Sequence, residues 1–302
     1  MSAFFFALVK NANFHKNSSM NSLLDLLKKS TDFLAKKGIE NARLQSELIF
    51  AGTLHCRRLD LYLQFERPLT QEETDRLRER VLRRARREPV QYILGDTDFR
   101  NLTLKCDPRA LIPRPETEEL VEFVLEKINC LKPDTATVRI LDLGTGTGAI
   151  ALSLATEKPG TQVVAVDKSA DALALARENH AGITPVPAVK FLQSDWFKNI
   201  SESFDVIVSN PPYLSQDEWK CAQPEVRDHE PLSALVAENA GLSDLEKILS
   251  AAHKHLLPGG FVALETGIAQ HEALAKIALS CGFSATESRT DLSGRPRFFF
   301  AS

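Results

Sequence analysis

From residue 138 to the end of the chain, short apolar segments alternate with segments of helical pattern. The apolar segments are too short for helices and are typical of buried strands. Because a helix follows most strands, successive strands pair in parallel through right-handed crossovers, and helices cover both faces of the sheet. The strand segments are VRILDL (138–143), TQVVAVD (161–167), VKFLQSD (189–195), FDVIVSN (204–210), GGFVALE (259–265), GFSATES (282–288) and RFFFA (297–301). The sequence therefore predicts an α/β fold with a doubly wound, mostly parallel sheet of about seven strands.

The chain before this alternation has a helical pattern. Leu23, Leu24, Leu27 and Leu34 recur at steps of three and four residues, which predicts a small bundle of helices. Its last helix, at about 70–87, is rich in arginine. This helix is either a patch for ribosomal RNA or an acidic protein partner, or a solvated face that neighbouring acids neutralise, and we favour the second interpretation. The arginines are Arg76, Arg78, Arg80, Arg83, Arg84, Arg86 and Arg87.

A short hairpin is predicted between the two patterns. Its apolar residues are Phe99, Leu102 and Leu104 with Leu111 and Ile112. Three prolines stiffen the connection, and the last of them opens the next helix. These prolines are Pro108, Pro113 and Pro115. The predicted boundaries are a flexible N-terminal extension at 1–19, a helical domain at 20–95, a hairpin linker at 96–115 and an α/β domain at 116–302.

Composition excludes several classes of protein. The chain has 302 residues and a formal net charge of −3, so we do not expect direct binding of nucleic acid. Five cysteines are scattered without a CxxC pair, so we expect no disulfide framework, no metal site and a reducing cytoplasm. The apolar run from Ala3 to Val9 is too short to span a bilayer, and we expect no membrane segment.

A glycine-rich segment, LDLGTGTGAIALSLA, follows the first predicted strand of the sheet. Gly144, Gly146 and Gly148 let the backbone approach a ligand closely at the amino end of the next helix. Asp167 closes the second strand, where a carboxylate can accept hydrogen bonds from ribose hydroxyls. Gly144, Gly146 and Ala149 also satisfy the dinucleotide pattern, so this segment alone leaves a nicotinamide enzyme possible.

The third strand of the sheet ends in Asp195 and Trp196. An acid and an aromatic ring at this place suit the amino group and the face of an adenine. The alternative for Trp196 is packing in the hydrophobic core.

The fourth strand, FDVIVS, ends abruptly in Asn210, Pro211, Pro212 and Tyr213. The two prolines lack backbone donors and have fixed φ angles, so the chain leaves the sheet there as a stiff turn. The turn presents carbonyl oxygens, one carboxamide and an aromatic ring to a ligand. This set suits a planar amine or amide nitrogen, whose hydrogens need acceptors.

Together these motifs resemble the class I methyltransferases that use S-adenosylmethionine, and NPPY is similar to motifs of enzymes that methylate amide or exocyclic amine nitrogens. Further segments resemble the HemK-type peptide chain release factor glutamine methyltransferases, from about residue 21 to the end. These segments are PVQYILG (89–95), LIPRPETEEL (111–120), HEPLSAL (229–235) and LPGGFVALETG (257–267).

The resemblance implies a fold, a reaction, a cofactor and a partner. The fold is a Rossmann-like catalytic domain at 116–302, which follows a substrate-recognition domain at 20–95 in the chain. The enzyme would transfer a methyl group from S-adenosylmethionine, leaving S-adenosylhomocysteine, to the glutamine side-chain nitrogen in the Gly-Gly-Gln motif of class 1 peptide chain release factors, and so modulate translation termination. The implied cofactor-binding residues are Gly144, Thr145, Gly146, Thr147, Gly148, Asp167, Trp196 and Asn210. The implied catalytic residues are Asn210, Pro211 and Tyr213, and the substrate-binding residues are Asn210, Pro211, Pro212 and Tyr213.

Three alternatives stay open at the level of the sequence. The NPPY segment suits the exocyclic amine of adenine in DNA or RNA as well as it suits glutamine. The chain could instead be a related enzyme that methylates a glutamine of a ribosomal protein. A chain of another class, either a nicotinamide oxidoreductase or a nucleotide-binding module without catalysis, could use the same glycine turn.

Overall fold

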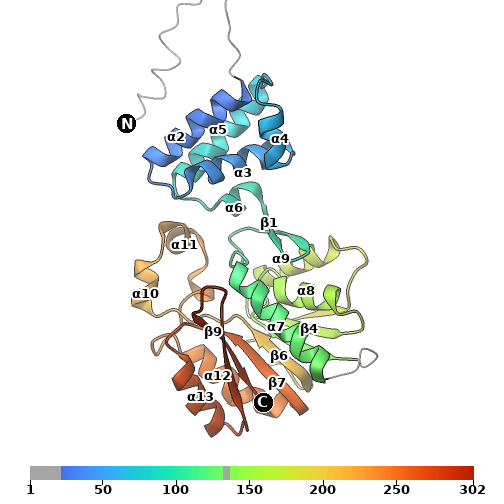
Figure 1. Ribbon diagram of the computed structural model, residues 1–302. Coiled ribbons are helices and arrows are strands. Elements are labelled where there is room, and N and C mark those ends of the chain that lie inside the picture. The colour runs from blue at the N-terminus through green and yellow to red at the C-terminus, as the bar shows by residue number, and fades with distance from the viewer. Residues whose placement is uncertain (1–21, 132–136) are drawn as a thin grey trace, which may run out of the picture. The chain divides into compact units, whose positions relative to one another are not determined.

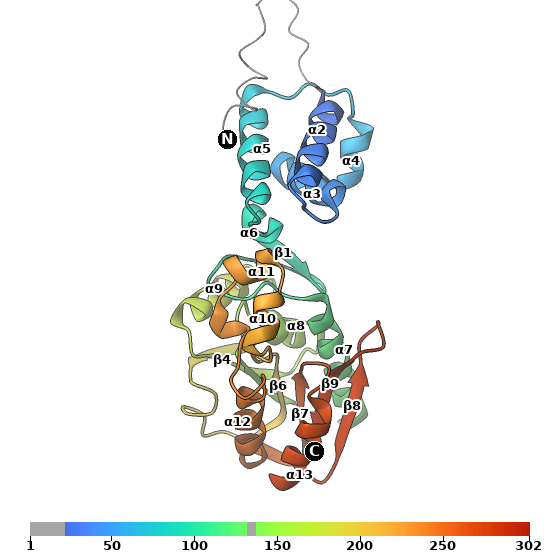
Figure 2. The same ribbon diagram turned by 90° about the vertical axis from the view of Figure 1, so that its left-hand side faces the viewer.

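The computed structural model describes residues 22–131 and 137–302 (Figures 1 and 2). The chain forms two compact units that divide between Arg86 and Arg87. The predicted extension at 1–19 lies outside the described residues. Every helix within the described ranges is too short or too polar to cross a membrane.

The first unit is a bundle of helices, as the leucine pattern predicts. The hydroxyl of Thr70 accepts the Glu73 N–H at 3.1 Å, and the Glu73 carboxylate accepts the Thr70 N–H at 2.9 Å, so the last helix of the bundle begins with a capping box. The helices are α2 (Leu23–Lys36), α3 (Ala42–Leu54), α4 (Arg58–Leu63) and α5 (Gln71–Ala85). The buried core of the unit includes Leu23, Leu27, Leu34, Ile49, Phe50, Leu61, Leu77 and Val81.

Two arginines of α5 make hydrogen bonds to side chains inside this unit. Arg84 is only 5% exposed, and its Nε donates to Gln45 Oε1 at 2.9 Å. Arg80 Nη1 donates to the Thr53 hydroxyl at 2.9 Å. Both contacts join α5 to α3. Arg80 and Arg84 therefore contribute to packing of the bundle.

Glu47 on α3 is the centre of a polar cluster in the same unit. It is 4% exposed and accepts hydrogen bonds from Arg43, Arg58 and Tyr62. Burial by itself would raise the pKa of Glu47, but these three hydrogen bonds outweigh it and lower the pKa below the ordinary value. The cluster joins α3 to α4, which is too short to be stable as an isolated helix.

The second unit contains one seven-stranded sheet in the order β5-β4-β3-β6-β7-β9-β8. Neighbouring strands from β5 to β7 pair in parallel, and β9 runs antiparallel to both β7 and β8. The strands are β3 (Arg139–Leu143), β4 (Gln162–Asp167), β5 (Val189–Gln193), β6 (Phe204–Ser209), β7 (Leu256–Glu265), β8 (Thr286–Thr290) and β9 (Pro296–Ala301). The prediction of a doubly wound, mostly parallel sheet of seven strands is confirmed.

Helices cover both faces of this sheet (Figure 1). Successive strand residues alternate between the faces, so Ile140, Val206 and Val208 lie in the core under α7 and α8. Leu141 and Ile207 lie in the opposite core, under α12 and α13. The main helices of the unit are α7 (Pro115–Leu131), α8 (Ala149–Glu157), α9 (Ala170–Ala181), α12 (Ser243–Ala252) and α13 (His271–Ser280).

The hairpin is shorter than the sequence predicts. Its strands, β1 (Asp96–Phe99) and β2 (Leu102–Lys105), follow the short helix α6 (Val90–Leu94), and the pairing ends at Lys105. The prediction that Leu111 and Ile112 belong to the hairpin is wrong. Both residues lie in the loop between β2 and α7, which follows the wall of a cavity instead of a strand. The remaining short elements are α10 (Gln216–Cys221), α11 (Pro224–His229), η1 (Leu232–Ala234) and η2 (His253–His255).

The Glu47 cluster predicts how the helical unit responds to pH. Replacement of Glu47 by glutamine removes the charge that holds Arg43 and Arg58, so we expect a loss of about 1–3 kcal/mol in the opening free energy of α3 and α4. A carboxyl group with a lowered pKa stabilises the folded state at a pH above its ordinary pKa. This stabilisation is lost as the pH falls through the pKa of the folded state. The difference between wild type and Glu47→Gln should therefore shrink once the pH falls below the ordinary carboxyl pKa, and it should disappear below the lowered pKa of the folded state.

Hydrogen exchange of peptides from α3 and α4, corrected for the intrinsic rate at each pH, measures this difference. The exposed Glu66 of the same unit provides the matched control, Glu66→Gln. Equal protection of all three proteins at neutral pH would contradict a stabilising role of Glu47.

Candidate active site

The cavity of the second unit lies where the sheet reverses its winding. β3 and β6 are neighbours in the sheet, and Leu143 pairs with Ser209 at their carboxyl ends. The Ser209 hydroxyl donates to the Leu143 carbonyl at 2.6 Å, which fixes the two strand ends together. A cavity of about 640 Å³ opens at this place, as expected for a switch point of an open α/β sheet. Its lining includes Ala110, Ile112, Arg114, Thr117, Gly144–Thr147, Asp167, Asp195, Trp196, Asn210, Pro211, Pro212 and Ser233.

The glycine turn forms one wall of the cavity. Gly144, Gly146 and Gly148 have φ angles of 70°, 55° and 86°, a region that disfavours residues with a Cβ atom. The turn leads directly into α8, so backbone N–H groups at the amino end of this helix are available to a ligand. The structure thus places Gly144, Thr145, Gly146 and Thr147 along the cavity.

Asp167 lies at the end of β4, beside this turn. Its Oδ2 accepts the Gly146 N–H and its Oδ1 accepts the Ser169 N–H, each at 2.9 Å. Burial raises the pKa of Asp167, although the backbone hydrogen bonds oppose this shift. The carboxylate is held at the cavity in a fixed orientation, and its remaining lone pairs can accept hydrogen bonds from hydroxyl groups.

Trp196 forms another part of the wall, with its ring close to the glycine turn. A Cβ atom built on Gly144 would lie 3.6 Å from the ring. The indole Nε1 donates to Asp244 Oδ1 at 3.3 Å, and Lys247 pairs with the same carboxylate. The ring also packs on the core under α12, so core packing and a position in the cavity wall both apply to Trp196.

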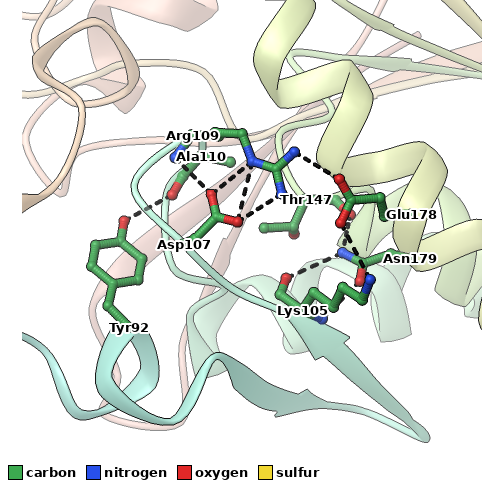
Figure 3. Close-up of polar contacts among 8 residues, drawn as sticks. All are labelled: Tyr92, Lys105, Asp107, Arg109, Ala110, Thr147, Glu178 and Asn179. Atoms are coloured by element: carbon green, nitrogen blue, oxygen red, sulfur yellow. Dashed lines mark hydrogen bonds and ion pairs between the residues drawn. The ribbon is translucent and has the colours of Figure 1, made fainter.

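The loop between β2 and α7 closes the cavity from another side, and polar contacts hold it in place (Figure 3). The Tyr92 hydroxyl donates to the Ala110 carbonyl at 2.9 Å. Arg109 pairs with Asp107 at 2.7 Å and with Glu178 on α9 at 2.8 Å. The loop is therefore bonded to both α6 and α9.

Asn179 on α9 connects the start of this loop to the glycine turn. Its Oδ1 accepts the Lys105 N–H at 2.7 Å, and its Nδ2 donates to the Lys105 carbonyl at 3.2 Å. The same Nδ2 donates to the Thr147 carbonyl at 2.9 Å (Figure 3). A single buried carboxamide thus satisfies three backbone groups of two separate segments.

Glu230 holds the far end of the loop. The side chain is buried, and it accepts hydrogen bonds from the Ile112 N–H and from the Arg114 guanidinium. A charged hydrogen bond of this kind is stronger than a neutral one. The HEPLSAL segment, which contains Glu230, therefore positions the loop that lines the cavity.

The NPPY segment brings its carboxamide to the cavity and its aromatic ring elsewhere. Asn210, Pro211 and Pro212 line the cavity, whereas Tyr213 is absent from the lining. The Tyr213 hydroxyl donates to Glu265 Oε1 at 3.0 Å, and the Arg297 guanidinium lies 5.7 Å from the centre of its ring. Tyr213 is therefore anchored in the protein beneath the turn.

Asn210 is bonded to a threonine of α7. Its Nδ2 donates to the Thr117 hydroxyl at 3.0 Å, and that hydroxyl donates to Glu265 Oε2 at 2.6 Å. Thr117 and Glu265 are buried, and sequence reasoning assigned neither of them a role. Both lie inside segments that the family resemblance singles out, LIPRPETEEL and LPGGFVALETG, and this was the available signal.

Gly241 and Gln270 support the same turn from behind. Gln270 Nε2 donates to the Tyr213 carbonyl at 3.0 Å. Gly241 has a φ angle of 82°, and a Cβ atom there would lie 2.1 Å from the Tyr213 carbonyl oxygen. The close approach of these two backbones requires glycine.

Asp142 is a further residue that sequence reasoning missed. It lies within β3 among apolar residues, and its Oδ2 accepts hydrogen bonds from the Thr145 hydroxyl at 2.6 Å and the Ala151 N–H at 3.2 Å. Its Oδ1 is buried without a hydrogen-bond partner, and burial raises the pKa of the carboxyl to about 7. The only signal in the sequence is an acid within an apolar strand, ILDL.

These residues fit S-adenosylmethionine. The cavity has room for a nucleoside, a glycine turn that admits close approach, a fixed carboxylate at Asp167 and an indole at Trp196. Such a site, at the switch point of a seven-stranded sheet of this order, defines a class I methyltransferase dependent on S-adenosylmethionine.

Comparisons with known proteins narrow this class to one family. Residues 25–95 match the PrmC N-terminal domain, and residues 123–224 match the methyltransferase small domain. A release factor glutamine methyltransferase of Geobacter sulfurreducens is 40% identical over 269 residues, 88% of this chain and 91% of that protein. One of Salmonella typhimurium is 44% identical over 233 residues, 77% of this chain and 82% of that protein. The chain belongs to the release factor glutamine methyltransferase family.

A solved structure agrees with the fold. The catalytic domain of hMettl16, in complex with MAT2A 3′UTR hairpin 6, aligns with a TM-score of 0.55 over 77% of this chain and 82% of that chain. Its sequence identity is 15%, so the likeness concerns the fold alone.

Asp142 predicts a pH dependence of the ligand-free protein. A carboxyl whose pKa is raised to about 7 in the folded state destabilises that state as pH rises through this value, because the unfolded chain loses the proton more easily. Asp142→Asn keeps an acceptor for Thr145 and Ala151 but cannot ionise. Between pH 5 and pH 8 we expect the wild type to lose about 1–3 kcal/mol of stability relative to this variant.

Urea unfolding followed by tryptophan fluorescence measures the difference, since both tryptophans, Trp196 and Trp219, lie in the second unit. Parallel pH profiles for the two proteins would show that Asp142 does not titrate in this range.

Proposed function

We propose that this chain transfers a methyl group from S-adenosylmethionine to the side-chain amide nitrogen of the glutamine in the Gly-Gly-Gln motif of class 1 peptide chain release factors, and so modulates translation termination. One observation carries this proposal. The Asn210 carboxamide lies at the cofactor cavity, and its Nδ2 is bonded to Thr117, which leaves its Oδ1 for a substrate. The release factor glutamine methyltransferases to which this chain is similar support the choice of substrate.

The chemistry of an amide nitrogen explains why an acceptor is needed. The lone pair of this nitrogen is delocalised into the carbonyl, so the nitrogen is a weak nucleophile. When bound, S-adenosylmethionine supplies an electrophilic methyl group on a sulfonium and leaves as S-adenosylhomocysteine, and the amide nitrogen releases one proton after the transfer. If Asn210 Oδ1 and the Pro211 carbonyl each accept one N–H of the substrate, they hold the nitrogen in place and favour the positive charge that develops on it. Positioning of this kind can contribute roughly 7–11 kcal/mol, so no nucleophile or dedicated base is needed.

The remaining residues of the NPPY segment have supporting roles in this proposal. Pro212 forms part of the stiff wall against which the substrate glutamine lies. Tyr213 lies outside the cavity lining, and its hydrogen bond to Glu265 holds the turn that carries Asn210.

The cofactor-binding residues follow from the other half of the cavity. The backbone from Gly144 to Gly148 would hold the charged part of S-adenosylmethionine, and Asp167 would accept from the ribose hydroxyls. Trp196 would contact the adenine ring. Asn210 lies at the junction between the cofactor and the substrate.

The cavity offers little aromatic surface on which a nucleic-acid base could stack. Enzymes that act on a flipped base hold it by stacking between aromatic or apolar side chains. Among the described residues that line the cavity, the sole aromatic side chain is Trp196, which lies on the cofactor side. Tyr213 has its hydroxyl bonded to Glu265 and Arg297 over its ring, so it is not free to stack on a base.

The helical domain at 20–95 is proposed to recognise the protein substrate in the cytoplasm. Its match to the PrmC N-terminal domain supports this assignment. On α4, Leu59 and Leu63 are 62% and 69% exposed and lie one turn apart on the same face. Exposed apolar side chains in such an arrangement are suited to a protein partner.

The proposal predicts the effect of removing the carboxamide. Asn210→Ala should lower the rate of methyl transfer about 10²- to 10³-fold, because one hydrogen bond to the reacting nitrogen is lost. Binding of S-adenosylmethionine, measured by calorimetry, should weaken much less. Mass spectrometry of a Gly-Gly-Gln peptide and of intact release factor measures the gain of one methyl group on the glutamine.

Near-normal turnover of Asn210→Ala would overturn the assigned role of Asn210. Methyl transfer to DNA, RNA or a ribosomal protein, with none to release factor, would overturn the proposed substrate.

The recognition role of the helical domain gives a separate prediction. Replacement of both Leu59 and Leu63 by glutamate should lower methylation of intact release factor by about 10-fold or more, which corresponds to a loss of roughly 1.4 kcal/mol in binding. Methylation of the short peptide should be unchanged, because the peptide uses only the cavity. Leu279→Glu, at a leucine that is 56% exposed on α13, is the matched control. An equal loss with peptide and intact factor would contradict a docking role.

A further inference from the structure

The NPPY carboxamide is connected through hydrogen bonds to two buried side chains. In each of these hydrogen bonds the donor lies farther from Glu265 than the acceptor does, so the bonds lead toward the Glu265 carboxylate. Asn210 Nδ2 donates to the Thr117 hydroxyl at 3.0 Å, and this hydroxyl donates to Glu265 Oε2 at 2.6 Å. The other oxygen of Glu265 accepts the Tyr213 hydroxyl at 3.0 Å. Each carboxylate oxygen thus accepts one hydroxyl group.

The fold brings these residues together from three elements. Ser209 pairs with Leu264, so Asn210 and Glu265 directly follow at the same level of neighbouring parallel strands, β6 and β7. Thr117 lies in the first turn of α7, which packs on the sheet above them. Glu265 is 1% exposed and Thr117 is 4% exposed, so water does not compete for their hydrogen bonds.

The direction of the bonds decides how the carboxamide is oriented. A threonine hydroxyl has a single hydrogen, and here that hydrogen is donated to Glu265. Toward Asn210 the hydroxyl can only accept, so the carboxamide must present its NH₂ group. If the carboxamide were flipped, two acceptors would face each other without a hydrogen between them. Only one orientation of Asn210 is compatible with an ionised Glu265.

We propose that Thr117 and Glu265 are positioning residues that fix the orientation of the Asn210 carboxamide, so that its Oδ1 faces the substrate nitrogen. This inference rests on the proposed role of Asn210 as an acceptor for the substrate N–H. In the flipped orientation Asn210 would present N–H groups to the N–H groups of the substrate. The network therefore separates an orientation that accepts the substrate from one that repels it.

The test compares Thr117→Val, which keeps the shape of the side chain and loses the hydroxyl, with Thr117→Ser, which keeps the hydroxyl. We expect Thr117→Val to lower kcat with the glutamine peptide by about 10- to 100-fold, as for a misplaced catalytic group. Thr117→Ser should restore kcat to within about 3-fold of wild type, the residual loss reflecting imperfect orientation. Affinity for S-adenosylmethionine should change much less than kcat in both variants.

Glu265→Gln gives an independent variant of the same size. A glutamine side chain has one oxygen and one NH₂ group, so the Thr117 and Tyr213 hydroxyls can no longer each donate to a separate oxygen. We expect a loss of kcat that Thr117→Val does not increase further when the two substitutions are combined, because both act on the same carboxamide. Thr161→Val is the matched control, since the Thr161 hydroxyl is also buried and makes no hydrogen bond.

A second measurement does not depend on the substrate. The side-chain NH₂ resonances of Asn210, assigned by their loss in Asn210→Ala, should shift in Thr117→Val and stay in place in Thr117→Ser. A wild-type enzyme that methylates no glutamine would refute the proposed function, and the resonances would still decide the orientation. The positioning role is refuted by unchanged resonances with kcat within 2-fold of wild type in Thr117→Val, by equal losses in Thr117→Val and Thr117→Ser, or by an equal loss in Thr161→Val.

Discussion

The parallel pairing of β3 with β6 is the constraint on which the site depends. The two strands are adjacent although 60 residues of chain lie between their ends at Leu143 and Phe204, and the intervening strands continue the sheet outward from β3. Because Leu143 pairs with Ser209, the glycine turn and the NPPY segment leave the sheet at the same level. The Ser209 hydroxyl bond to the Leu143 carbonyl then fixes this junction. The glycine turn and the NPPY segment meet at the cavity because of this one register.

Buried polar groups position the walls of the cavity around that junction. Asn179 and Glu230 hold the two ends of the loop between β2 and α7, while Thr117 and Glu265 hold the carboxamide of the NPPY segment. A buried polar group is costly unless it is hydrogen-bonded, so these hydrogen bonds favour the observed arrangement of the cavity walls. The consequence is a site whose geometry is set before any ligand arrives, which suits a reaction that depends on positioning.

Much of the fold was predictable because strands, turns and glycines leave local signals. Alternating apolar segments predicted seven strands, and the doubled proline of NPPY marked the end of β6. The hairpin was predicted too long at Leu111 and Ile112, because apolar residues that line a cavity resemble strand residues in sequence. The recognised motifs also contained Thr117 and Glu265, but their pairing across 148 residues of chain has no local signature.

The sequence by itself determined the fold class, the glycine turn with its acid at Asp167, and the family, since each depends on residue types at short spacing. Only the tertiary structure decided which side chain of NPPY faces the cavity. It turned Asn210 toward the cavity and anchored Tyr213 to Glu265, because the register of β6 with β7 places an ionisable group beside the turn. The orientation of the Asn210 carboxamide depends on Thr117 and on the residue to which Thr117 itself donates, Glu265. Both residues come from distant parts of the chain.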